Sequence, residues 1–400
     1  MVKRINEHNI GIATVLNFAI LPLTGFATDI YLPSLPTMAA SLHVSNIQVQ
    51  TTLTVFLVSY GISQLFIGSV LDSFGRYRIS LAALVVFALA GLVIANTNNI
   101  WLIYAMRMLH GITAAAVVVA KRTFFVDVYK GEKLKHYLSL FSIVWSTGPI
   151  IAPFAGGYLQ ANFGWQSNFY LLSGLALVFA VLEYFFNGES LPEPAPFSIK
   201  RSAGVYGNML GTPSFSLGLL VIGLSYSMVM VYNMTGPFII EHHLHFTPVM
   251  AGYCSLILGF AWMAGGFIGK AAIRKPFLKK LSVNLLLQIC LVGLMLLSIG
   301  LAENIYTLVA FAFLVHACAG FAFNVYFTYC LSKFPTNAGI ASGLTGGIMY
   351  VIVSAFSYGI VWLIPAKNQL HLGYSYLVLI ALSALIMWRV FVINRRELIQ

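Results

Sequence analysis

The chain has 400 residues, of which 59% are hydrophobic and only 8% are charged, whereas a soluble domain carries about 25% charged residues. This composition excludes an ordinary soluble domain and predicts an all-α membrane protein, because the apolar segments are continuous and about 20 residues long, the length that a helix needs to cross a bilayer. The net charge of +11 would suit nucleic acid only if the basic residues formed a patch, and they lie in alternate loops instead.

Twelve membrane spans are predicted with a hydropathy window of about 19 residues. The first six are Ile10–Pro33, Ile47–Val70, Ile79–Ala95, Ile100–Ala120, His136–Leu159 and Trp165–Phe186. The second six are Phe215–Ile240, Val249–Gly269, Leu281–Leu301, Ile305–Leu331, Ala338–Trp362 and Tyr374–Ile393. The polar connection 187–214 contains Glu, Pro and two basic residues, so we interpret it as a cytoplasmic linker between an N-terminal half, 1–186, and a C-terminal half, 215–400.

The basic residues are distributed unevenly between the two sides of the predicted membrane. Nineteen of the 22 Lys and Arg residues lie at one set of helix ends, Lys367 lies at the other, and Arg107 and Arg389 lie inside spans. Because cytoplasmic loops carry the excess of Lys and Arg, both termini are predicted to be cytoplasmic. The basic surplus is therefore a sign of topology in the lipid bilayer, and no nucleic-acid partner is expected.

Neither a metal nor a cofactor is predicted. The four cysteines lie in spans of the second half and lack the spacing of a zinc or redox site: Cys254, Cys290, Cys318 and Cys330. Glu241 is followed by histidines at 242, 243 and 245. This cluster could bind a metal or sense pH, but a solvated cluster is the favoured interpretation.

Asp29 is an acid near the end of the apolar run that begins at Ile10. An ionisable group in hydrocarbon is costly, so Asp29 is predicted to be functional, and the alternative is a helix cap at the water interface. Arg107 lies about 10 Å inside the outer end of its own span, at a depth that overlaps that of Asp29. The two charges are expected to pair or to share a water-filled cavity, unless Arg107 only snorkels to the interface.

The loop between the second and third spans contains Gly68, Asp72, Gly75 and Arg76. Glycine allows a tight turn, and an acid beside bases at the cytoplasmic face can pair with neighbouring helix ends, although a solvated loop is the alternative. The segment resembles the signature loop of the major facilitator superfamily, G-x-x-x-D-R-x-G-R-R, but lacks two of its basic residues. The resemblance implies a role in gating.

The fifth span contains Gly148, Pro149, Pro153 and Gly157. Proline removes helix hydrogen bonds and glycine lets a neighbouring helix approach, so a kinked and tightly packed helix is predicted. The segment resembles the antiporter motif of Bcr/CflA drug exporters within the superfamily. Its predicted contribution to gating is structural, as a bend and a seal.

Further resemblances follow along the chain. Residues 107–111 are similar to an R-x-x-Q-G element with His110 in place of glutamine, and residues 28–36, 236–238 and 337–343 are similar to Bcr/CflA segments. Together they imply a twelve-helix major facilitator of two six-helix bundles in the bacterial inner membrane. The implied function is export of small organic compounds in exchange for protons, and a monomer is expected. Because such exchange needs a group that both binds and releases a proton, the intramembrane acid Asp29 is predicted to be the proton carrier and Arg107 its modulator.

Two other transport functions are alternatives: export of an endogenous metabolite such as a siderophore, and proton-coupled import of a nutrient. An intramembrane enzyme would need a nucleophile and base, or metal ligands, at one depth in neighbouring spans, and the sequence offers no such set.

Eight polar or aromatic residues in spans are candidate substrate contacts: Tyr31, His110, Tyr226, Tyr232, Asn233, His316, Asn324 and Tyr326. Aromatic residues make up 14% of the chain, so most of them pack, and about half of the six in the seventh and tenth spans are expected to face a substrate path. Contacts of this kind discriminate weakly between molecules, so they do not identify the cargo.

Overall fold

The computed structural model describes residues 4–5, 9–191, 193, 199–299, 303–334, 338–365 and 367–397. Over these ranges the chain is helical, and its only extended pairing is an isolated bridge between Arg4 and Glu189. The chain divides into two compact units, Met1–Ser202 and Ala203–Gln400. The division falls inside the segment expected to be a linker.

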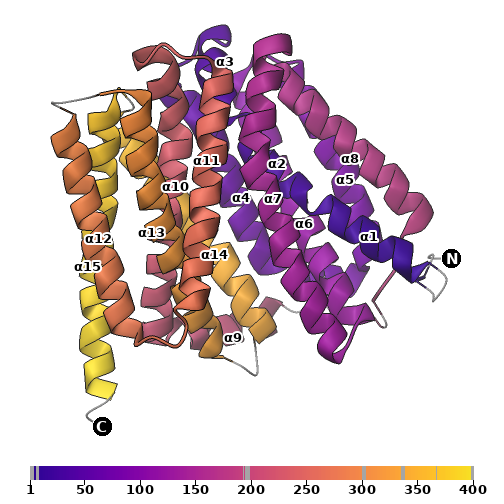
Figure 1. Cartoon of the computed structure of the whole chain (residues 1–400). Helices are drawn as coiled ribbons and strands as arrows, with labels where there is room; N and C mark the ends of the chain where they lie inside the picture. The colour runs from indigo at the N-terminus through magenta and orange to yellow at the C-terminus, as the bar shows by residue number, and fades with distance from the viewer. Residues whose placement is uncertain are drawn as a thin grey trace. The chain divides into compact units, whose positions relative to one another are not determined.

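The first unit contains eight α-helices, shown from indigo to magenta in Figure 1. In it α4 packs on α6, α5 packs on α6 and α8, and α2 packs on α7. The helices are α1 (Ile10–Ile20), α2 (Pro22–Asp29), α3 (Leu35–Ser41), α4 (Asn46–Phe74), α5 (Arg76–Ala95), α6 (Ile100–Val128), α7 (Gly131–Phe163) and α8 (Gln166–Phe186).

The first predicted span is longer and less regular than expected. It runs on to Ser41 and is broken into α1, α2, a 3₁₀ turn (Leu32–Ser34) and α3. Each break lies beside a proline, Pro22, Pro33 or Pro36, because proline cannot donate the helix hydrogen bond and collides with the preceding turn. Figure 1 shows α1 leaning away from the direction of α2. The break leaves Asp29 as the last residue of a helix inside the unit.

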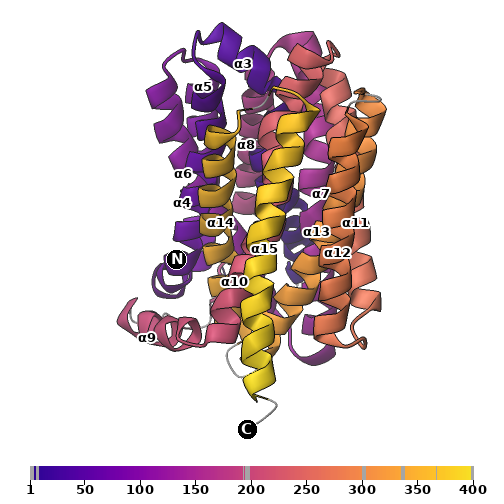
Figure 2. The same cartoon turned by 90° about the vertical axis from the view of Figure 1, so that its left-hand side faces the viewer.

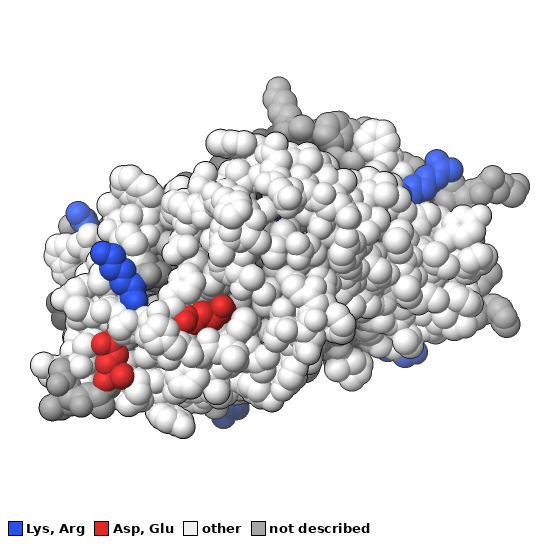
Figure 3. Space-filling model, turned by 90° about the horizontal axis from the view of Figure 1, so that it is seen from above, with Lys and Arg blue, Asp and Glu red and all other residues white. Residues whose placement is uncertain are grey.

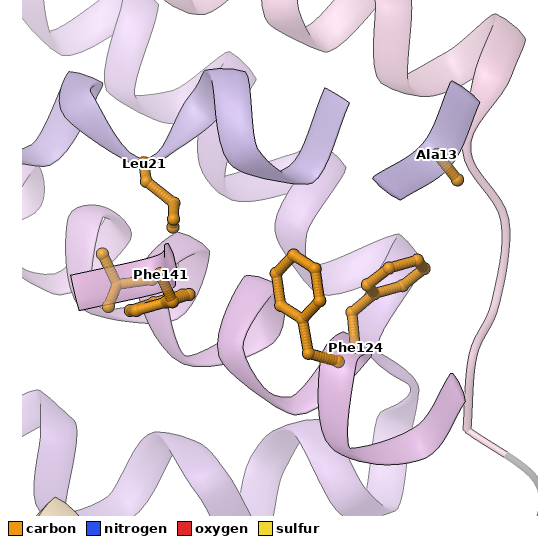
Figure 4. Packing of buried hydrophobic residues seen from close by; sticks show 6 residues of the cluster. Ala13, Leu21, Phe124 and Phe141 are labelled. Atoms are coloured by element: carbon orange, nitrogen blue, oxygen red, sulfur yellow. The ribbon is translucent and has the colours of Figure 1, made fainter. Parts of the chain in front are cut away.

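An aromatic cluster holds α1 against α6 and α7 (Figure 4). Ala13 and Leu21 meet Phe124, Phe125 and Phe141, and all five are buried. Phe18 adds a ring contact, with its centroid 4.5 Å from that of Phe125. Helices of a membrane protein associate through close van der Waals packing, so this cluster anchors α1 despite the break that follows it.

The second unit contains the remaining helices, and α10 is its most buried one, packed against α13, α14 and α15. Figure 2 shows α9 lying at a steep angle to α10 and α15, so the expected linker contains a helix of its own. The elements are α9 (Ile199–Leu210), α10 (Pro213–Phe238), a π-helix (Ile239–His243), α11 (Pro248–Ala271), α12 (Phe277–Ser298), α13 (Ile305–Ser332), α14 (Ala338–Leu363) and α15 (Gln369–Glu397).

Eleven helices within the described residues are long and apolar enough to cross a membrane. The other predicted span, His136–Leu159, lies inside α7, a helix of 33 residues. Each of the twelve predicted spans therefore contains a described helical segment, and residues 300 and 301 of the ninth span lie outside the described residues. Figure 3, seen from the end where α3 lies, shows few charged side chains among uncharged ones.

The predicted end of the fourth span is wrong, and the error concerns the position of a buried charge. Helix α6 continues to Val128, eight residues past the predicted end at Ala120. Lys121, expected as a loop charge, therefore lies within the helix and is only 1% exposed. The hydropathy window ended the span at the first charged residue, but the partner of that charge lies far along the chain.

Candidate functional site

Arg107 is the largest wholly buried side chain of the first unit. From α6 its Nη1 donates to the carbonyl of Ala27 at 2.9 Å and its Nε to the carbonyl of Thr52 at 3.4 Å. Its guanidinium carbon also lies 4.4 Å from the ring centre of Phe56 and 4.6 Å from that of Tyr31. Arg107 is thus held on several sides by protein groups, and the interpretation that it snorkels to the interface is wrong.

Asp29 lies at the end of α2, 1% exposed, close enough to Arg107 for the two charges to interact. The carbonyl of Ala27 is one of those that the end of α2 leaves without a helix partner, and Arg107 binds it. A cation at a helix C-terminus also complements the helix dipole. The alternative of Asp29 as a cap at the water interface is wrong, because the carboxyl is enclosed by protein.

Tyr31 connects this arginine to α4. Its hydroxyl lies 3.0 Å from Oγ1 of Thr52 and accepts from Arg107 Nη2 at 3.4 Å. The Thr52 hydroxyl itself donates to the carbonyl of Val49, at 2.6 Å. Tyr31 therefore donates to Thr52 while it accepts from Arg107, which fixes the direction of each hydrogen bond in this series.

His110, one helical turn beyond Arg107, is wholly buried and stacked on Phe87. Its Nε2 lies 3.0 Å from the Phe87 carbonyl, which can only accept, so Nε2 carries the proton. Its Nδ1 then accepts from Arg107 Nη1 at 3.5 Å. Both ring nitrogens of a neutral imidazole thus have protein partners, and contact between His110 and a substrate stays a prediction.

Gly111 explains how α4 comes within reach of Arg107. A Cβ at this position would lie 2.5 Å from the carbonyl oxygen of Phe56 and 2.9 Å from the nitrogen of Tyr60. Only a residue without a Cβ allows this approach of the two backbones. The glycine thereby places Thr52 and Phe56 against the guanidinium one turn away.

The predicted antiporter motif packs against the Asp29 segment. Pro149 and Pro153 lie inside α7, and Gly148 and Pro149 meet Gly25 of α2, where an added Cβ would collide. Gly156, another glycine of the predicted motif, meets the carbonyl of Ile30 directly after Asp29. The motif thus supports the helix that carries the acid. Gly157 lies in the same turn of α7.

The predicted glycine-rich loop is helical except at Gly75, because α4 runs on to Phe74 and α5 begins at Arg76. The segment, still called the glycine-rich loop below, forms a network rather than a solvated turn. Arg76, whose side chain is 11% exposed, binds Asp72 at 2.9 Å and also contacts Asp127 at the end of α6. Gly75 has a φ of +92°, which favours glycine. Gly68 is half-buried, and a Cβ there would meet nothing within 4 Å. The contacts of the loop thus centre on Arg76.

Glu189 completes this network, and sequence reasoning missed it. Its carboxylate accepts from the backbone nitrogens of Arg76 at 3.0 Å, Tyr77 at 3.2 Å and Leu191 at 3.0 Å. The first two are N-terminal groups of α5 without helix partners, so a carboxylate there satisfies them and complements the dipole. An isolated acid just after a span was the only available signal.

The candidates of the second unit fall into separate places. His316 and Tyr232 are together, with ring centres 5.5 Å apart, and His316 Nε2 lies 3.2 Å from the hydroxyl of Tyr376. The ring of Tyr226 contacts those of Trp262, Phe323 and Tyr350. The ring of Tyr326 contacts those of Phe277 and Tyr329. Asn324 lies against Gly269, and Asn233 is 9% exposed. Among the six, Tyr232 and His316 thus form one cluster.

The family model of the Major Facilitator Superfamily matches residues 18–358, which contain the Asp29, Arg107, Asp72 and Pro149 segments just described. The chain belongs to this superfamily. Major facilitators move small molecules across membranes, so the chain is a multi-pass membrane transporter. No group of three or more metal-ligating side chains occurs within the described part of the chain.

Relatives within the superfamily include an uncharacterized MFS-type transporter of Bacillus subtilis, 30% identical over 82% of this chain and 83% of the relative. Multidrug resistance protein D of Escherichia coli is 26% identical over 93% of both chains. A bicyclomycin resistance protein homolog of Haemophilus influenzae is 37% identical over 44% of both. The solved nucleoside transporter NupG shares the fold, with a TM-score of 0.71, 13% identity and coverage of 95% of this chain and 98% of that chain.

Proposed function

We propose that this transporter exports small organic compounds from the cytoplasm in exchange for protons. Two relatives, named as a bicyclomycin resistance protein homolog and multidrug resistance protein D, support this kind of cargo. The 19-to-1 distribution of Lys and Arg between the two sets of helix ends supports an orientation with both termini in the cytoplasm, and we place the protein in the bacterial inner membrane. We further propose that the monomer is the working unit. The names of these two relatives refer neither to siderophore export nor to nutrient import.

The observation that carries the coupling is the enclosure of Asp29 beside Arg107 in the first unit. A carboxyl in such a place responds to two opposing effects, exclusion of water and a neighbouring positive charge. A change in hydration or the arrival of a substrate alters their balance, so the acid can bind a proton in one state and release it in another. Arg107 itself stays charged and acts as the modulator.

The test is reconstitution into liposomes with an imposed pH gradient, using a compound that the parent protein accumulates. Asp29→Asn should lose accumulation driven by the gradient, yet keep exchange of labelled for unlabelled compound at equal pH. Glu132→Gln, which removes an exposed acid in the first turn of α7, is the matched control and should still accumulate. Accumulation by Asp29→Asn equal to that of the parent would rule out the proton role of Asp29.

A further inference from the structure

A buried ion pair lies in the first unit, apart from Arg107. Lys121 of α6 donates from Nζ to Oε1 of Glu183 in α8 at 2.5 Å, and the two side chains are 2% and 0% exposed. Ser80 of α5 donates from Oγ to the other oxygen of Glu183 at 3.4 Å. Three helices therefore meet at one carboxylate. Burying two charges is costly and often stabilises less than apolar packing, so a stabilising role alone does not explain the pair.

The contacts of Glu183 continue into the chain that leaves α8. The side-chain amide of Asn187 donates to Glu183 Oε1 at 3.5 Å, and its backbone nitrogen donates to the Glu183 carbonyl at 3.0 Å. Asn187 is itself buried, 3% exposed. The Glu183 carboxylate, which binds Lys121, therefore also binds the side chain of Asn187, the first residue after α8.

The segment that begins at Asn187 carries groups of the glycine-rich loop network. Glu189, two residues on, covers the N-terminus of α5, and Ser190 donates from Oγ to Asp127 Oδ2 at 2.9 Å. Asp127 is in turn a partner of Arg76. A continuous line of contacts therefore runs from Lys121 through Glu183 and this segment to Arg76.

We propose that Lys121 and Glu183 are positioning residues: their ion pair sets the course of the chain out of α8 and so places Glu189 on the N-terminus of α5. The effect on transport rests on the proposed gating role of the loop at Asp72, whereas the effect on structure does not. A neutral pair of equal volume would preserve the packing of the three helices but would leave Asn187 without its acceptor.

The test uses a background in which the four native cysteines are replaced by serine and Leu191→Cys serves as a reporter. Lys121→Met/Glu183→Leu should keep the Tm of this parent, since apolar residues replace the buried charges, but a thiol reagent should label the reporter about fivefold faster or more. Asn187→Ala, which keeps the ion pair, should raise labelling similarly. His243→Gln, which removes the contact of an exposed imidazole with Glu303 in the second unit, is the control and should leave labelling unchanged.

An unchanged labelling rate in the double variant would overturn the proposal. Should the double variant fail to fold, Asn187→Ala decides alone, because a parent-like rate there means that Glu183 does not direct the segment. Faster labelling together with parent-like transport would support the positioning role and reject the gating role of the loop, so the two ideas can fail separately.

Discussion

The guanidinium of Arg107 binds the carbonyl of Ala27, two residues before Asp29, across 80 positions of sequence at 2.9 Å. The acid and the cation are thus coupled through the backbone of one helix end as well as through their charges. If Asp29 carries the proton as proposed, a change in its charge acts on the same helix end that Arg107 holds.

Removal of the positive charge at position 107 should change the pH dependence of transport. Without the guanidinium, release of a proton from Asp29 requires a more alkaline solution, so Arg107→Met should move the pH optimum upward. The measurement is transport rate against pH in liposomes. Arg107→Lys should also be impaired, because an ammonium cannot reproduce the planar contacts with Ala27, Thr52 and the two rings. An unchanged optimum in Arg107→Met would contradict the coupling.

His110→Gln should be tolerated. The neutral imidazole donates through one nitrogen and accepts through the other, and a carboxamide offers the same pair of groups, one donor and one acceptor. We expect transport within about twofold of the parent, whereas His110→Leu should lose about tenfold or more because a buried hydrogen bond of Arg107 is removed. Parallel losses in both variants would show that the ring itself is needed.

Gly111→Ala should destabilise the first unit. The added methyl would overlap the backbone of α4 at Phe56 and Tyr60, and overpacking of this kind costs about 1–3 kcal/mol. Gly174→Ala in α8 is the matched control, because nothing lies within 4 Å of the added Cβ there. Thermal unfolding in detergent is the measurement. Equal Tm values for the two variants would mean that α4 and α6 can separate without cost.

Asp72→Asn should shift the equilibrium between the outward-open and inward-open states less than Asp127→Asn does. The side chain of Asp72 is 48% exposed and that of Asp127 is 10% exposed, so the ion pair of Asp72 with Arg76 is worth only about 0–1 kcal/mol. We expect both variants to shift the population toward the inward-open state and to slow transport without loss of substrate binding. Distances between spin labels at the cytoplasmic ends measure the shift. If Asp72→Asn leaves them unchanged, the loop is ordinary structure.

The predicted topology places Lys367 outside and the segment 187–214 inside. In a background free of native cysteines, a membrane-impermeant thiol reagent applied to intact cells should label a cysteine at position 367. It should spare a cysteine at position 208, in α9, until the cells are opened. Labelling at 208 from outside would invert the proposed orientation.

The sequence by itself determined the class of protein, the spans and the residues worth testing. Continuous apolar runs in a chain with 8% charge indicate helices in a membrane. The prolines at 149 and 153 indicated a kinked helix, and the glycines at 148 and 157 indicated close packing, before any contact was known. Asp29 and Arg107 were recognisable because an isolated charge in an apolar segment needs a reason. These are local properties, and local properties are readable from composition and spacing.

Only the tertiary structure decided which distant groups meet. Lys121 was counted as a loop charge, and its partner Glu183 lies 62 residues away. The contact of Glu189 with α5 could not be predicted, because Glu189 lies 113 positions from Arg76 and nothing in the sequence indicates that the two meet. The tautomer of His110 likewise follows from a carbonyl on another helix. Hydropathy sums over neighbours in sequence, whereas the energy of a buried charge depends on its neighbours in space, and those are set by how the helices pack.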